Sequence, residues 1–451
     1  MREGRRDGTD KSAGLQRLRT SSRGGVPGRL IVLVLCAAVA AGCSSPDGSV
    51  CSGELHLGSS GAAFMTVADV QGGGAPEVIV CAGAECNVLG LDCAMRRGIT
   101  GPRGFSPQMV SDLDGDRKGE LIGAALGGET LRPVALNGCG DVIFRAGDED
   151  GISVAMPLGR VAAGVGDVVP VAVWNGLVVS RVMPAAPYGK RGLVAHRPGS
   201  PEPLWGFGFP WVPRGVVPAE DNGRQVLLPE YQTNPASEYY YLGERTLGFA
   251  AREQVYVTTL SSTGEVVRSV RVSWRDEPLS GRATFRPLEK SSADSHRRET
   301  VVLAERRLGE KVFLHTLGLA DGEVRRSYTL PARAYRGSVV LPEGGGARIV
   351  LAAAQDGAVR LTFLSQELET VEETTFPWED VELLGVHRDP TTQRVGALVR
   401  APDEVVLVFG ADASRVLLTL DGMHVATARR IDGALIIAGA TGESVRVAVH
   451  R

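Results

Sequence analysis

The sequence predicts an all-β fold, an eight-bladed β-propeller whose N-terminal strand completes the last blade. Three observations lead to this prediction: a repeated pattern of strands, no amphipathic helical segment after the N-terminal leader, and a composition that favours strands and turns. The 451 residues include 58 Gly and 25 Pro, and 43% are hydrophobic but only 5% aromatic, which is typical of short strands joined by many turns. The net charge of −3 and the 22% of charged residues disfavour both a disordered chain and a basic nucleic-acid-binding protein.

The first element is a leader that does not belong to the fold. Residues 1–29 carry eight basic and three acidic side chains, and an apolar run of twelve residues, 30–41, follows. This run is shorter than the roughly 20 residues that cross a bilayer. Small residues precede Cys43 and resemble a bacterial lipobox, so residues 1–42 are expected to be a lipoprotein signal peptide and Cys43 the lipidated first residue. An ordinary secretory signal and a buried helix are the alternatives.

The mature chain is therefore expected to be tethered to a membrane without spanning it. Residues 43–50 read as a flexible tether and residues 51–451 as the propeller. Removal of the leader leaves a net charge of −8, which argues against nucleic acid or anionic lipid headgroups as the main partner. We expect the protein in the bacterial cell envelope, lipid-anchored and extracytoplasmic, on the periplasmic face or the cell surface.

A repeat organises the mature chain. Residues 67–80 and 110–123 align without gaps and place Asp69 and Asp112 43 residues apart. Residues 162–174 form a third, weaker copy, and later copies keep an alternation of apolar and polar residues with a period of two, which fits strands with one buried face. Units of four strands are expected to begin near Phe64, Gln108, Met156, Gly215, Arg282, Gly337, Val381 and His424.

The eighth unit supplies only three strands before the chain ends. The segment Gly53–Gly58, which stands alone before the first unit, is expected to supply the fourth, because joining the termini in one sheet closes the ring and removes its open edges. Seven blades are the alternative. A right-handed parallel β-helix is disfavoured, because turns such as SSTGE and LADGE indicate antiparallel hairpins.

The turn DLDGD at residues 112–116, followed by Glu120, resembles the FG-GAP or VCBS repeat of integrin-type propellers, in which DxDGDxxxE loops bind Ca²⁺. Carboxylates at alternate positions can point into one concavity, and crowded carboxylates repel one another unless a cation neutralises them. The expected ligands of a structural Ca²⁺ are Asp112, Asp114, Asp116, Glu120 and the carbonyl oxygen of Lys118. A solvated acidic turn is the alternative reading.

The first unit keeps this pattern only in part. Gln71 and Gly73 replace two of the acids, so Ca²⁺ binding is not expected there. A weaker likeness is to the eight-bladed propeller lipoprotein of the outer-membrane β-barrel assembly machinery, carried by the phrase VALNGCGDVIFR at residues 134–145. It implies an assembly-factor role at the outer membrane.

Five cysteines follow the predicted lipid site, and an exported setting favours disulfide bonds among them. Cys81 and Cys86 stand at the two ends of a predicted hairpin and are expected to pair. Cys93 could pair with either Cys51 or Cys139, and one thiol is left over in any scheme. The spacing gives no CxxC motif, so a zinc site has little support. Buried free thiols are the alternative.

Aromatic residues are concentrated near the fourth unit, around its longest interruption. Aromatic side chains on an irregular insertion can form a contact surface, and packing of an oversized blade is the alternative. The expected binding surface consists of Trp211, Tyr231, Tyr239, Tyr240 and Tyr241.

No catalytic constellation stands out in the sequence. The seven His residues are scattered singly, and neither GxSxG nor HExxH occurs. The sequence therefore predicts a protein that is not an enzyme, a binding or scaffold module for an unidentified protein or glycan. An outer-membrane assembly factor and a propeller hydrolase or lyase are the alternatives.

Overall fold

The computed structural model describes residues 48–55, 57, 63–146, 154–156, 159–161, 167–182, 192–200, 202–208, 212–221, 224–233, 256–272, 281–288, 301–308, 310–341, 349–388, 394–410, 414–420, 423, 425–441 and 443–450. These residues form strands and turns, with no helix among them. Accordingly, no helix of a length and hydrophobicity suited to crossing a membrane occurs in this part of the chain. The leader and Cys43 lie outside the described residues.

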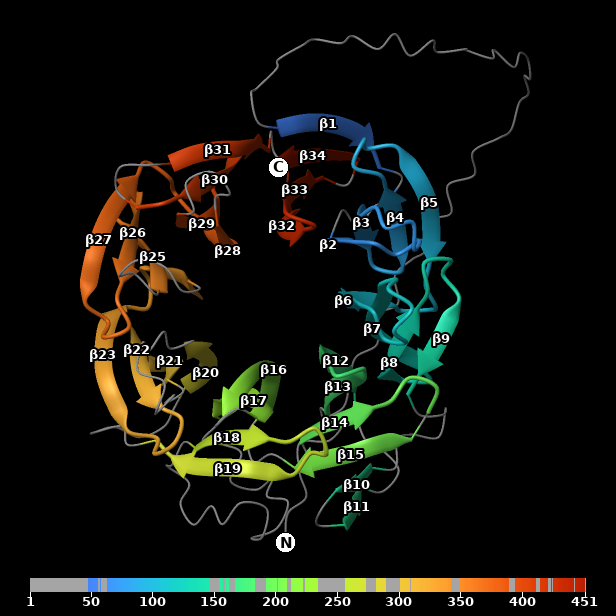
Figure 1. Ribbon diagram of the computed structural model, residues 1–451, viewed down its shortest axis with the longest axis horizontal. Helices are drawn as coiled ribbons and strands as arrows, with labels where there is room; N and C mark the ends of the chain where they lie inside the picture. Colours follow the sequence, from blue (N-terminus) through green and yellow to red (C-terminus); the bar gives the residue numbers. More distant parts are fainter. Residues whose placement is uncertain are drawn as a thin grey trace, which may run out of the picture. The chain divides into compact units, whose positions relative to one another are not determined.

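Eight blades of four antiparallel strands surround a common axis, which confirms the predicted fold (Figure 1). In each blade the first strand lies nearest the axis and the fourth at the rim. The strands of blades 1 to 4 are β2 (Phe64–Ala68), β3 (Glu77–Ala82), β4 (Glu85–Leu89), β5 (Met95–Thr100); β6 (Ser106–Ser111), β7 (Glu120–Gly127), β8 (Thr130–Leu136), β9 (Val142–Arg145); β12 (Val168–Trp174), β13 (Leu177–Val182), β14 (Gly192–His196), β15 (Pro203–Gly208); and β16 (Val212–Asp221), β17 (Arg224–Thr233), β18 (Tyr256–Leu260), β19 (Val266–Arg271).

The remaining blades repeat this order. Blades 5 to 8 consist of β20 (Gly281–Leu288), β21 (Val301–Leu308), β22 (Lys311–Gly318), β23 (Val324–Pro331); β24 (Tyr335–Val340), β25 (Ile349–Gln355), β26 (Ala358–Leu364), β27 (Thr370–Phe376); β28 (Glu382–Arg388), β29 (Val395–Arg400), β30 (Glu404–Val408), β31 (Ser414–Thr419); and β32 (Val425–Ile431), β33 (Ala434–Ala440), β34 (Ser444–His450) with β1 (Gly48–Glu54). Blades 4 and 5 are also joined, because Gln232 of β17 pairs with Arg282 of β20.

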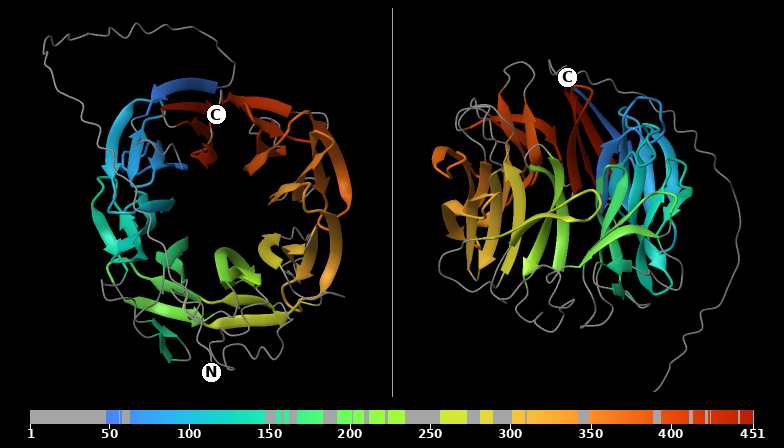
Figure 2. Two further views of the ribbon diagram at one scale, coloured as in Figure 1. Left: turned by 180° about the vertical axis from the view of Figure 1, so that it is seen from behind. Right: turned by 60° about the horizontal axis from the view of Figure 1, so that its bottom comes forward.

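The ring closes through the N-terminal strand, as expected, but at a different segment. Strand β1 begins at Gly48 and pairs with β34 in seven positions, with Cys51 opposite Val447, so the expected strand at residues 53–58 lies five residues too late. Both views of Figure 2 place β1 beside the C-terminal strands. Leu55 follows β1, donates its N–H to the Glu443 carbonyl at 2.8 Å and is only 5% exposed. The N-terminal strand therefore pairs with the C-terminal strand as predicted, but the strand consists of residues 48–54 and not of residues 53–58.

The third blade also differs from the prediction, since its first strand begins at Val168 and not near Met156. The chain between blades 2 and 3 forms a separate hairpin of β10 (Val154–Met156) and β11 (Gly159–Val161). This hairpin pairs with no blade strand. An insertion therefore interrupts the 43-residue spacing on which the prediction depended.

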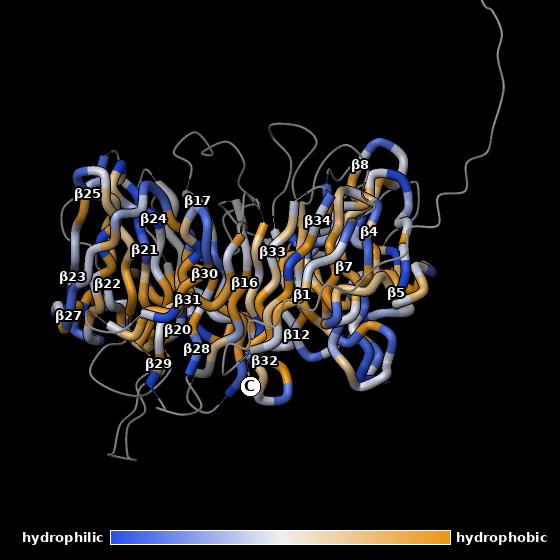
Figure 3. The backbone as a smooth tube through the Cα atoms, turned by 90° about the horizontal axis from the view of Figure 1, so that it is seen from above, coloured by the Kyte–Doolittle hydropathy of each residue, from blue (hydrophilic) through white to orange (hydrophobic). Residues whose placement is uncertain are grey.

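The core lies between the blades. Within the described residues, seven apolar clusters each join consecutive blades, and the cluster that holds Val67 and Val78 of blade 1 also holds Ile436 and Val447 of blade 8. Figure 3 shows apolar residues concentrated along the strands and polar residues at the loops. Because the sheets bury both faces against neighbours, the inner strands read as nearly continuous apolar runs.

Candidate functional site

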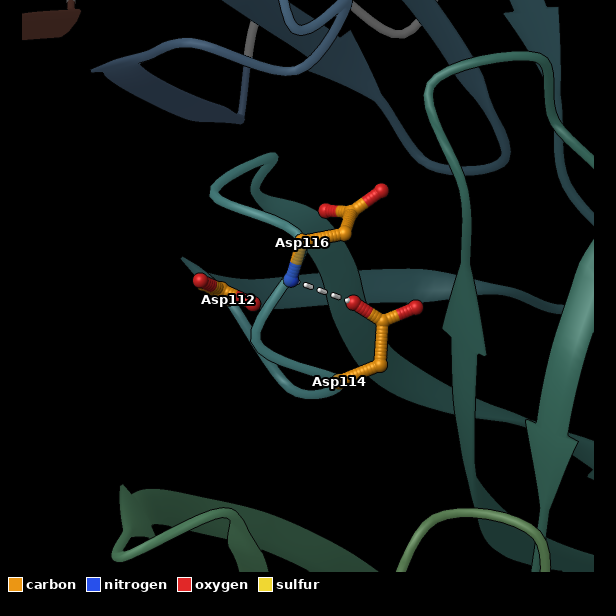
Figure 4. A group of neighbouring side chains, drawn as sticks. All are labelled: Asp112, Asp114 and Asp116. Atoms are coloured by element: carbon orange, nitrogen blue, oxygen red, sulfur yellow. Dashed lines mark hydrogen bonds between the residues drawn. The ribbon is translucent and has the colours of Figure 1, made fainter.

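The predicted acidic loop joins β6 to β7 in blade 2. Its three aspartates, Asp112, Asp114 and Asp116, are exposed and present carboxylate oxygens within 4.8 Å of one another (Figure 4). Asp112 accepts hydrogen bonds from the N–H groups of Gly115 at 2.7 Å and Arg117 at 3.0 Å. Gly115 adopts a φ of 85°, which a glycine tolerates without strain. The loop therefore brings three carboxylates together on a turn, and hydrogen bonds from its own backbone to Asp112 stabilise that turn.

Lys118 and Glu120 lie outside this group of carboxylates. The Lys118 ammonium lies 3.0 Å from the second oxygen of Asp116, whose first oxygen accepts the Lys118 N–H at 2.8 Å. These two bonds from Lys118 lower the pKa of Asp116, and the Asp116 carboxylate raises the pKa of Lys118. The lysine already neutralises one of the three aspartates, and a cation at this loop would compete with it.

Glu120 is buried and stabilises the loop through a hydrogen bond to its backbone. Its side chain is 3% exposed at the start of β7, and its carboxylate accepts the Leu113 N–H at 2.7 Å. Burial raises the pKa of Glu120, the bond from Leu113 lowers it, and the three aspartates raise it further. Glu77 does the same in blade 1, where it accepts the Val70 N–H at 2.9 Å. The glutamate of this motif thus satisfies a buried backbone donor in both blades.

The two loops also contact each other. Gly119 donates its N–H to the Asp69 carbonyl at 2.6 Å, which joins blade 2 to blade 1. Asp69 accepts the N–H groups of Gly72 and Gly74 at 2.6 and 2.8 Å, as Asp112 does in its own loop. The loops of blades 1 and 2 therefore share one pattern of hydrogen bonds from the backbone to acidic side chains. Of these two loops, only that of blade 2 carries the extra carboxylates.

The cysteines form two disulfide bonds, Cys51–Cys93 and Cys81–Cys86. The second links β3 to β4 within blade 1, as expected. The first resolves the choice for Cys93 and links β1 of blade 8 to the last turn of blade 1. Cys139 is the remaining free thiol; it is exposed, and its sulfur accepts a hydrogen bond from Arg97 at 2.7 Å.

The aromatic surface predicted from the sequence lies almost wholly outside the described residues. Trp211, Tyr239, Tyr240 and Tyr241 fall there. Tyr231 belongs to β17, where its backbone is opposite Pro213 and Ala283.

A groove between blades 5 and 6 was not anticipated from the sequence. It has a volume of about 720 Å³ and is bounded by the end of β23, the connection at residues 331–334 and the turn at residues 355–358. A second hollow of about 600 Å³ shares Leu330 and Arg333 with it and extends it towards Lys311. The lining is mixed: Leu330, Leu351 and several alanines are apolar, and arginine, threonine and acidic side chains are polar.

Charged side chains line the groove; Arg336 and Arg360 are paired, whereas Arg333, Asp356 and Glu379 form no ion pair among the described residues. Arg336 forms an ion pair with Asp380 at 2.8 Å and donates to the Arg333 carbonyl at 2.9 Å. Arg360 contacts Glu373 at 3.6 Å and bonds the side chain of Gln355. Arg333 is exposed, and its guanidinium has no ion pair or hydrogen bond among the described residues. The groove therefore offers one unpaired cation, Arg333, and two unpaired carboxylates, and the half-buried ring of Tyr328 also lines it.

A buried polar network holds the two blades together behind the groove. The Tyr335 hydroxyl donates to the Glu305 carboxylate of β21, and Arg286 of β20 donates to the Ser338 carbonyl of β24. Burial is the main cause that raises the pKa of Tyr335, which keeps its hydroxyl protonated as a donor. Arg307 stacks over the Tyr335 ring at 5.2 Å. This network fixes the spacing of the blades that form the groove.

The sequence matches no family model, and no curated protein matches it. Solved structures do match. A quinohemoprotein alcohol dehydrogenase from Pseudomonas putida shares 10% identity with a TM-score of 0.50, over 89% of this chain and 76% of that one. A europium-containing methanol dehydrogenase shares 10% identity with a TM-score of 0.47, over 86% and 92%. The Dos1 propeller shares 8% identity with a TM-score of 0.44, over 90% and 92%. The first of these likenesses shows the propeller fold.

The comparison with the alcohol dehydrogenase corrects one expectation. The sequence predicted a protein that is not an enzyme, because no catalytic constellation stood out in it. That inference is overturned, since the matched protein is an enzyme built on the same fold over 89% of this chain. A likeness at 10% identity concerns the fold alone, so no dehydrogenase residue, cofactor or reaction is transferred. The chain is an eight-bladed β-propeller of a fold that includes enzymes.

Proposed function

We propose that this protein is a lipid-anchored, extracytoplasmic β-propeller of the bacterial cell envelope that binds a protein or glycan partner in the groove between blades 5 and 6. The observation that carries the proposal is the groove itself, a hollow of about 720 Å³ with the spare guanidinium of Arg333 at its wall. Ligand sites are concave, with an apolar floor and a few polar groups that fix orientation.

At Arg333 the groove favours an anionic group on the partner, whereas the exposed acids Asp356 and Glu379 favour a cationic or hydroxyl group. Arg333 can pair with a carboxylate, either on an acidic peptide or on an acidic sugar, and the Tyr328 ring of the same groove can pack against either ligand. Nucleic acid is disfavoured as a partner by the net charge of −8 expected after removal of the leader.

The proposed location rests on the leader and on the cysteines. The order of basic residues, apolar run and Cys43 favours export and lipidation. The two disulfide bonds support an oxidising compartment, because such bonds persist outside the cytoplasm.

The test is capture of partners from solubilised cell envelopes by wild-type protein, Arg333→Glu and a matched control, Arg103→Glu. Arg103 is also exposed and lies in the equivalent connection, between blades 1 and 2. We expect Arg333→Glu alone to lose the partner by at least tenfold. Equal capture by all three proteins would contradict the groove assignment. Recovery of barrel-assembly components would identify the partner as that machinery.

We also propose that the loop of blade 2 is an FG-GAP-type site for a structural Ca²⁺. The support is the group of three carboxylates within 4.8 Å of one another and the motif that they belong to. Ca²⁺ would neutralise their repulsion and brace the contact with blade 1, and it would take no part in chemistry.

Calcium should therefore raise the melting temperature of the wild type, and Asp114→Ala should abolish the increase. The control is Glu129→Ala, an exposed acid at the opposite end of the same blade, which should keep the full increase. Differential scanning calorimetry with calcium or with chelator measures the effect. A wild-type melting temperature that is the same with calcium and with chelator would show that this loop holds no stabilising Ca²⁺.

A further inference from the structure

The exposed hydrophobic residues are confined to one position of the fold. Within the described residues, every large hydrophobic side chain that is exposed lies in the first three residues of the outermost strand of a blade, on β1, β5, β9, β15, β19, β27 and β31. Blade 5 is the exception, because Val324 at the start of β23 is half-buried. Exposed apolar residues scattered at random would not select one strand and one end of it. We call this set the apolar belt.

The belt marks a single end of the propeller. Each outermost strand runs antiparallel to the third strand of its blade, so the outermost strands all begin at the same end. The arrows of β31, β1 and β5 follow one another in the same sense around the ring (Figure 1). Strand β1 begins at this end too, at Gly48, which follows Cys43 by five positions in the sequence.

We propose that the part of the belt on blades 7, 8 and 1 lies against the lipid bilayer into which the anchor inserts. This part consists of Val416, Val50 and Met95, which are 54%, 60% and 41% exposed. The inference rests on the proposed lipidation of Cys43. Four residues lie between Cys43 and Gly48, so the five steps of a fully extended chain between them span at most about 18 Å. Blade 8 therefore cannot move far from the membrane surface.

The side chains beside the belt differ between these three blades and blade 6. Arg96 and Arg97 follow Met95 and are exposed, and Arg415 precedes Val416. Arg96 forms an ion pair with the exposed Asp92 at 2.8 Å, and Arg97 donates to the Gly138 carbonyl at 3.3 Å. Arginine next to an apolar residue suits a bilayer, because the aliphatic stem covers apolar surface while the guanidinium reaches the headgroups. Blade 6 has the opposite character, because exposed Glu369 and Glu373 flank the belt there.

Blade 6 supplies a matched control for the test. Val371 occupies the corresponding part of β27 and is 51% exposed, close to the 54% of Val416. Both residues become labelling sites in a Cys139→Ser background, as Val416→Cys and Val371→Cys, with the two disulfide bonds left oxidised. Each variant is labelled with a polarity-sensitive fluorophore. The full lipidated protein is then reconstituted in vesicles of phosphatidylethanolamine and phosphatidylglycerol.

We expect the probe at 416 to shift to the blue and to be quenched by brominated lipids at least twofold more than the probe at 371. An insertion of twenty Gly and Ser residues before Gly48 should remove most of this difference while the protein still binds the vesicles. Equal quenching at the two positions would overturn the proposal. Burial of the 416 probe that depends on protein concentration and not on lipid would assign the belt to a second copy of the chain, and would also overturn it.

Failure of the anchor can be told apart from failure of the contact. The mass of the N-terminal peptide and flotation with vesicles report lipidation directly. If the peptide carries no acyl chains, the proposed anchoring is wrong and the contact falls with it. If the protein is acylated and floats but the two probes behave alike, the contact alone is wrong.

Discussion

His196 shows at the scale of one residue how a blade interface can depend on pH. It ends β14, has no exposed surface, and neither ring nitrogen has a hydrogen-bond partner. Its ring lies 6.0 Å from that of Phe144 in blade 2. Burial lowers the pKa of His196 to about 4. The neutral ring therefore suits the fold, and the charged ring does not.

Stability should consequently decrease as the pH decreases from about 6.5 towards 4. In that window the unfolded chain binds a proton at His196 and the folded chain does not, so acid favours unfolding. At pH 5 the loss at this residue is on the order of 2 kcal/mol. His196→Phe should remove that part of the pH dependence, as measured by urea unfolding at pH 7.5 and pH 5. His315, whose pKa burial also lowers to about 4, remains in both proteins and leaves a residual slope. An identical slope in variant and wild type would contradict the assignment.

The role of an individual acidic residue depends on whether its side chain is buried, and burial cannot be read from the sequence alone. Asp112 and Glu120 belong to one motif, yet the first is exposed and the second is 3% exposed and bonded to the Leu113 N–H. The sequence indicated a loop that could gather carboxylates. It did not indicate that its glutamate would support a buried backbone donor, because that depends on how β7 enters the core.

At the scale of the element, the two disulfide bonds differ in what they connect and in the length of the loop that each closes. Cys81–Cys86 joins strands that are already paired and closes a short span of 5 residues. Cys51–Cys93 has a separation of 42 residues and joins two blades across the closure of the ring. A cross-link that closes a longer loop restricts the unfolded chain more.

Replacing both cysteines of each pair by serine should therefore have unequal effects. On the loop-entropy estimate, Cys51→Ser with Cys93→Ser should lower the free energy of unfolding by about 4 kcal/mol, and Cys81→Ser with Cys86→Ser by about 2 kcal/mol. Denaturant unfolding of the two double variants, both carrying Cys139→Ser, measures the difference. A larger effect of the short loop would show that strain or packing, and not chain entropy, governs these bonds.

The strands themselves were largely predictable, and the exceptions have local causes. Alternation of apolar and polar residues identified seven of the eight blade starts to within a few residues. It failed at β1, because residues 49–53, SVCSG, have no apolar alternation and residues up to 50 were assigned to the tether, although β1 pairs with β34 from Gly48 onward. It failed at blade 3, where the hairpin of β10 and β11 is inserted before Val168. The groove was beyond prediction, because residues 328–331 of blade 5 and residues 353–358 of blade 6 line it together only after the two blades have packed.

At the scale of the whole molecule, the ring is closed by its own N-terminal strand. Seven backbone positions of β1 pair with β34. Cys51 and Leu55 also join the apolar cluster that connects blades 8 and 1. An open ring would leave the edge of β34 unpaired, and an unpaired edge recruits other strands. Closure therefore protects the molecule from association as well as adding stability.

Deletion of residues 43–54 should for this reason be far more damaging than deletion of residues 43–47, when both proteins are exported with an ordinary cleavable signal. The longer deletion removes β1 and its disulfide bond and exposes Val445 and Val447, so we expect a decrease in melting temperature of at least ten degrees and association on gel filtration. The shorter deletion should leave both properties unchanged. The variant Cys51→Ser with Cys93→Ser separates the two contributions, because it keeps the strand pairing without the covalent link and should remain monomeric. A monomeric, fully stable protein without residues 43–54 would show that the seven remaining complete blades close the ring without this strand.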